Sequence, residues 1–155
     1  DNPELLAAYL NYHFMQGREE VVMMRSGTPP SGEALVMQDS LGNPVGYMGS
    51  EIVYDRDEIQ KGLDKVSLGI ELYPDRLDLR WGKVWVLGQM SRWDVFEETI
   101  IQAIERSAEN NNEWIWLNNE QLGEGSQGFI AGLQDYQMQL LNTYEDSLLK
   151  RMRNT

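Results

Sequence analysis

The sequence contains few residue types that could carry out proton transfer or nucleophilic attack. His13 is the only histidine among 155 residues, and the chain has no cysteine. A Ser-His-Asp arrangement would have to use His13 as its base. His13 follows Tyr9 by one helical turn, so we expect a packed or half-buried side chain instead. The lack of cysteine also excludes disulfides, thiolate catalysis and Cys-based zinc sites.

Carboxylates are the remaining candidates for catalysis, because 25 residues are Asp or Glu. A carboxylate pair can hydrolyse a glycosidic bond, and one such pair, Glu120 and Glu124, follows Trp114 and Trp116 in a Gly-rich loop. With this many acidic residues, pairs also arise by chance. We therefore expect no hydrolase activity, and keep this loop as a distant third hypothesis.

Two short acidic segments could be considered as metal sites. Asp55 and Asp57 are better explained as the start of a helix, where Asp caps free backbone amides. Residues 39–43 lack the alternating oxygen ligands and the closing Glu of a calcium loop, so they indicate a turn. The sequence thus predicts no enzyme, no cofactor and no metal site.

Composition limits the partners of the chain. The formal net charge is −12, which repels the phosphates of nucleic acid. No stretch approaches the roughly 20 apolar residues of a membrane helix, so we predict no membrane insertion. The chain begins without Met and ends in a helical pattern, so we expect a longer natural protein. The compartment stays open between the bacterial cytoplasm and export.

Apolar spacing predicts a mostly α chain that forms a single domain over residues 1–155. A helix should begin at Asn2 and Pro3, followed after Gly17 by a short second helix over residues 19–25. Further helices are expected from Asp55 to just before Pro74, over 77–90, over 95–108, and from about residue 129 onwards. An interruption of the last helix at residues 142–143 is left open.

Residues 26–55 break the helical pattern. Gly, Pro and Ser dominate residues 26–32, and apolar segments 34–38 and 45–48 then flank a Gly/Asn turn. This arrangement predicts a β-hairpin, with an additional extended piece at 51–54. We interpret 26–55 as a β-hairpin insertion within the helical domain.

Residues 57–108 follow the order helix, proline, helix, tight turn, helix, with Pro74 after the first helix and Trp93 in the turn. This arrangement resembles the tetratricopeptide repeat (TPR) family. The family has a period of about 34 residues and a proline near the end of each repeat. When Pro74 is matched to that proline, the aromatic residue of the family's turn falls on Trp93. The residues that carry the resemblance are Gly62, Gly69, Ile70, Pro74, Trp93, Ala103 and Ile104. The resemblance implies antiparallel helical hairpins stacked as an α-α superhelix.

Some positions depart from the family pattern. Val84 and Phe96 stand where small residues are usual, and Arg80 and Lys83 stand where aromatic or apolar residues are usual. The resemblance is weaker over 126–153 and is lacking over 26–55. The chain is therefore similar to an atypical bacterial member of the family.

The resemblance implies a non-catalytic protein–protein interaction or scaffold module, since such stacks offer grooves for peptides and partner domains. The partner would be a basic or neutral protein or peptide, and an exposed end of the stack could join two copies. Trp81 and Trp85 are four residues apart, so they share a helical face that either packs or contacts a ligand. The candidate binding surface comprises Trp81, Trp85, Trp114, Trp116, Asn118 and Asn119.

The alternative is a small-ligand or carbohydrate-binding module that uses Trp114 and Trp116. Flat aromatic faces suit sugar rings, and the amides of Asn118 and Asn119 both donate and accept hydrogen bonds. Exposed indole rings would support this hypothesis, and buried rings would remove it.

Overall fold

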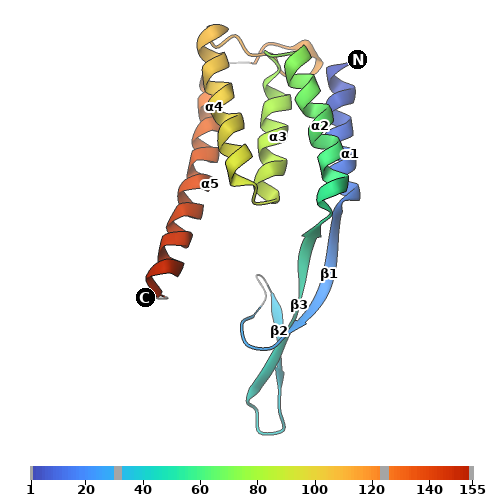
Figure 1. The fold of residues 1–155 in the computed structure, drawn as a ribbon, viewed down its shortest axis with the longest axis vertical. Helices are drawn as coiled ribbons and strands as arrows, with labels where there is room; N and C mark the ends of the chain where they lie inside the picture. The colour runs from blue at the N-terminus through green and yellow to red at the C-terminus, as the bar shows by residue number, and fades with distance from the viewer. Residues whose placement is uncertain (1, 30–32, 123–125, 154–155) are drawn as a thin grey trace.

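The computed structural model describes residues 2–29, 33–122 and 126–153, with side chains described to residue 145. Within these residues the chain forms a helical body and a β arm that projects beyond it (Figure 1). The elements in order are α1 (Pro3–Gln16), β1 (Arg18–Arg25), β2 (Ala34–Gln38), β3 (Pro44–Tyr54), α2 (Arg56–Leu72), α3 (Leu77–Gln89), α4 (Trp93–Glu109), the 3-10 helix η1 (Leu117–Asn119) and α5 (Ser126–Arg153).

Local capping explains where the first helices begin. The Asn2 side chain accepts a hydrogen bond from the Glu4 amide at 2.8 Å, and Pro3 occupies the first turn of α1. Asp55 caps α2 in the same way, accepting from the amides of residues 57 and 58. α2 ends at Leu72, two residues before Pro74, as the proline predicts.

Residues 19–25 are a strand, so the prediction of a short helix there is wrong. β1 runs antiparallel to β3 over its whole length, from the Arg18–Tyr54 pair to the Arg25–Tyr47 pair. The β-branched residues Val21 and Val22 favour a strand. Pairing with β3 also gives the N–H and C=O groups of every second residue of β1 a hydrogen-bond partner. The extended segment therefore begins at residue 18 rather than 26.

The predicted hairpin is confirmed and is part of a larger sheet. β2 and β3 flank a turn in which Asp39 accepts from the amides of Leu41 and Asn43, and Gly42 has a φ of +85°. The sheet order is β1-β3-β2. The β arm is thus a three-stranded antiparallel sheet with β3 at its centre, and it includes β1, which lies outside the predicted insertion 26–55.

The helices of the body run in alternating directions and pack side by side (Figure 1). α1 and α2 are joined through the β arm, and α3 and α4 through a tight turn. Gly62 lets α1 approach closely, because a Cβ there would lie 3.0 Å from the Cβ of His13 and 3.1 Å from the Cα of Leu10. The fold is therefore mostly helical, with paired antiparallel helices.

The core is confined to the helical body. It contains apolar side chains from α1 to α5 and Trp114 from the connection between α4 and α5. α5 runs through residues 142–143 as one continuous helix, with no interruption there. None of the helices in the described ranges is long and apolar enough to cross a membrane. The fully buried large side chains are Trp114, Arg76, Phe96, Ile59, Leu77, Leu79, Leu87, Val66, Val84, Val86 and Thr99.

Candidate functional site

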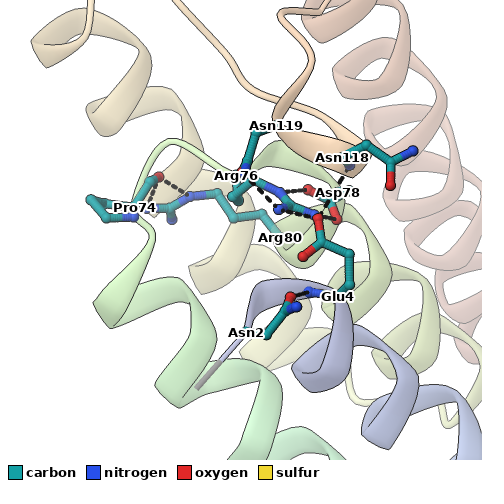
Figure 2. A network of polar contacts seen from close by, with 8 residues as sticks. All are labelled: Asn2, Glu4, Pro74, Arg76, Asp78, Arg80, Asn118 and Asn119. Carbon is teal, nitrogen blue, oxygen red and sulfur yellow. Dashed lines mark hydrogen bonds and ion pairs between the residues drawn. The ribbon is translucent and has the colours of Figure 1, made fainter.

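Arg76 is the buried centre of a polar network at one end of the body (Figure 2). It lies in the turn between α2 and α3 and is only 2% exposed. Its Nε and Nη2 donate to the two carboxylate oxygens of Asp78 at 2.8 and 2.9 Å, and its Nη1 donates to Glu4 Oε1 at 2.8 Å. Arg76 therefore ties the start of α1 to the start of α3.

The network extends to the segment that precedes α5. Arg76 Nη1 also donates to Asn119 Oδ1 at 3.3 Å, and the Asn118 amide donates to Glu4 Oε1 at 3.2 Å. Hydrogen bonds from its own backbone and from Arg76 lower the pKa of Glu4. The predicted site residues Asn118 and Asn119 are thus used to fasten their own segment to the body.

Arg80 is a charged residue that the fold holds in a nearly buried position, with 5% of its surface exposed. Its Nε and Nη2 both donate to the Pro74 carbonyl, at 3.2 and 3.1 Å. The guanidinium lies 5.8 Å from the centre of the Trp114 ring, and burial lowers the pKa of Arg80. The residue stabilises the α2–α3 turn and covers one of the predicted ligand-binding rings.

A second polar cluster lies beside the first. Arg106 makes a two-pronged ion pair with Asp75, with Nε–Oδ1 and Nη2–Oδ2 distances of 2.9 and 3.2 Å. Asn110 adds a 3.0 Å hydrogen bond to Asp75 Oδ1, and the Arg106 contact is the main reason that the pKa of Asp75 is lowered. A hollow of about 370 Å³ adjoins this cluster. The Asp75 carboxylate is already paired with Arg106, so this cluster links the α2–α3 turn to α4.

The Trp81 and Trp114 side chains are buried in the core. The rings of both stack on Phe129 of α5, with centroid distances of 5.6 and 5.4 Å. Trp114 is 2% exposed and Trp81 is 8% exposed, whereas Trp85 is 46% exposed and touches Phe14 edge-on. Trp81 and Trp85 therefore do not share one environment, and the predicted candidate surface is divided.

The buried position of Trp114 argues against the carbohydrate-binding hypothesis. It required exposed faces at Trp114 and Trp116, but the Trp114 ring is enclosed by Phe129 and Arg80. Trp116 is half-buried against the core. The structure does not bring the two indoles together as an exposed platform.

Of the residues considered for catalysis, His13 is held in a structural contact. His13 Nδ1 lies 2.8 Å from Glu58 Oε1 in a half-buried pair between α1 and α2. Among the described residues no group of three or more His, Asp or Glu side chains could hold a metal ion. Of the predicted carboxylate pair, Glu120 is exposed and Glu124 lies outside the described residues.

Sequence reasoning missed an apolar surface on the β arm. The strand register places Val22, Met24, Leu35, Met48 and Ile52 on one face, which we call the arm face. The exposed fractions of Val22, Met24, Leu35 and Ile52 lie between 42% and 75%. A hollow of about 570 Å³ on this face is lined by Val22, Leu35 and Met48. Two consecutive Val and two Met between charged residues in β1 were the signal that could have indicated it.

No protein-family model, curated protein or solved structure matches this chain.

Proposed function

We propose that the chain is a non-catalytic protein–protein interaction module in which the helical body holds the β arm out to a partner. The observation that carries this proposal is the arm face, where adjacent Val, Met, Leu and Ile side chains lie open to solvent. Contiguous exposed apolar surface on a folded protein marks interaction sites. A small sheet gains stability from an apolar face or from packing against a helix, and the arm extends beyond the helices that could cover its face (Figure 1).

The chemistry of the body supports a scaffold role. Arg76, Asp75 and His13 each have charged partners within the fold. A general acid or base would instead need a pKa close to the working pH, whereas Arg106 lowers the pKa of Asp75 and keeps this carboxylate ionised. These groups stabilise turns and helix ends, so the body is suited to hold a surface in position.

The paired helices support a scaffold of the TPR-like kind. α1/α2 and α3/α4 form successive hairpins, and the close approach at Gly62 is the packing that small residues permit. The net charge of −12 favours partners that are neutral or basic.

Leucine variants on the two regions test the proposal. Leu35→Ser changes the arm face, and Leu72→Ser is the matched control because Leu72 is 51% exposed at the end of α2. We expect the intact chain and the Leu72→Ser control to retain the same proteins in affinity capture, and Leu35→Ser to lose them. Equal retention by all three chains would exclude the arm face, and turnover of a small substrate by the chain would contradict the non-catalytic role.

A further inference from the structure

β1 forms one edge of the sheet over eight residues. The order β1-β3-β2 gives β1 a strand neighbour on one side only, within the described part of the chain. β1 contains no proline, and its centre is Val21–Met24. An edge strand that is long, apolar and open is a template for pairing with another strand.

The backbone groups that face this open edge can be identified. The Asp55 amide donates to the Gly17 carbonyl at 2.7 Å, one step beyond the Arg18–Tyr54 pair. Hydrogen-bonded pairs alternate along an antiparallel ladder. Residues 19, 21, 23 and 25 therefore bond to β3, and the N–H and C=O groups of residues 18, 20, 22 and 24 point away from the sheet.

The charges of β1 are complementary to those of a second β1 in one register. When two antiparallel copies form one continuous sheet, opposite residues share a face. If Val22 lies opposite Val22 of the second copy, Glu19 lies opposite Arg25 at both ends. These positions are non-hydrogen-bonded pairs, where side chains are closest. Moving the register by two residues in either direction separates the opposite charges.

Overall charge also favours this edge over other surfaces. The chain has a net charge of −12, so two copies repel each other over most of their surfaces. β1 carries two Arg and two Glu and is neutral. A second copy can therefore approach along β1 without a net local repulsion.

We propose that two copies of this chain associate through antiparallel pairing of their β1 edges, with Val22 on the two-fold axis and Glu19 of each copy facing Arg25 of the other. The resulting sheet would run continuously across both arms and join their two arm faces. The inference rests on the proposed function, because it names a second copy as one partner of the arm.

Charge exchange between the copies tests the register. Glu19→Arg places two Arg opposite each other at both ends, and Arg25→Glu places two Glu there. Each variant alone should dimerise at least about tenfold more weakly than the wild type. An equimolar mixture restores opposite charges at both ends, so we expect it to recover dimer. Sedimentation velocity over about 5 to 200 µM measures the masses.

Val22→Pro tests the backbone contacts independently. The Val22 amide faces the open edge, so proline removes a donor to the second copy without removing one to β3. Val22→Thr keeps the amide and the strand preference and is the matched control. We expect monomer for Val22→Pro and dimer for Val22→Thr, with unchanged helical circular dichroism.

Three results would overturn the inference. They are a wild-type chain that stays monomeric over the whole concentration range, a charge-exchanged mixture that stays monomeric although both variants are folded, and a Val22→Pro variant that still dimerises. None of them affects the proposed function, since loss of captured proteins by Leu35→Ser would persist in a monomeric chain.

Discussion

The helical body and the β arm use apolar residues in opposite ways. In the body, Leu, Ile, Val, Phe and Trp side chains from successive helices are buried against one another. In the arm, Gly46 is the one described residue that is buried, and the large apolar side chains are exposed or half-buried. Apolar composition alone therefore does not decide which segment forms a core. The topology decides it, by placing a second layer over one region and none over the other.

The two regions meet at a small, tightly packed junction. A Cβ on Gly17 would lie 2.6 Å from Ile59 Cγ1, and the Phe14 and Tyr54 rings are 5.8 Å apart. The Asp55 amide also donates to the Gly17 carbonyl at 2.7 Å. The arm is thus continuous with α1 and α2, and its base is held by the same helices that close the body.

Arginine variants should show the largest difference in unfolding free energy between the helical body and the β arm. Arg76→Met leaves the nearly buried Asp78 carboxylate without its partner, and we expect a loss of about 3–5 kcal/mol in the free energy of unfolding. Arg25→Met breaks the more exposed Arg25–Glu51 pair of the arm, which should cost about 0–1 kcal/mol. Urea unfolding followed by circular dichroism measures both. Equal losses would contradict the division into a packed body and an open arm.

Leucine variants make the same comparison without charge. Leu63 is buried in α2, so Leu63→Ala should cost about 2–5 kcal/mol through lost contacts and a cavity. Leu35 is exposed on the arm face, and Leu35→Ala should change stability by less than about 0.5 kcal/mol. The readout is again the urea midpoint and slope. A large destabilisation by Leu35→Ala would mean that the arm face is covered by the body.

Elements with local stop and start residues could be predicted from the sequence. Asn2, Asp55 and Pro74 define helix ends through their own caps or ring geometry, and the structure confirms these ends. Gly42 and Asp39 define the hairpin turn in the same way. These predictions needed only neighbouring residues, because the determining contacts are local.

Elements that depend on distant partners could not be predicted. β1 is a strand because β3, about 30 residues later, pairs with it. The burial of Trp114 depends on Phe129 and Arg80 from other elements, and the sequence around Trp114 does not indicate these contacts. In the Arg76 network, Glu4 is separated from Arg76 by 72 positions in the sequence and Asn119 by 43. No spacing rule indicates contacts between residues so far apart.

The smallest effect that separates the regions should be the acid sensitivity of the body. Arg106 lowers the pKa of Asp75 in the folded chain. The ionised Asp75 therefore stabilises the fold fully at pH values above its unfolded pKa, near 4. This stabilisation is lost as the pH falls through the lower pKa of the folded state. Asp75→Asn should be slightly less stable near neutral pH, by less than about 1 kcal/mol, because Asp75 is partly exposed. Between about pH 5 and 3 the Asp75→Asn variant should then lose less stability than the wild type.

Arg106→Gln should flatten the same pH dependence of stability, because it returns the Asp75 pKa toward its ordinary value. Urea unfolding at each pH gives the slopes, and a variant that falls in parallel with the wild type would assign the acid sensitivity to other carboxylates.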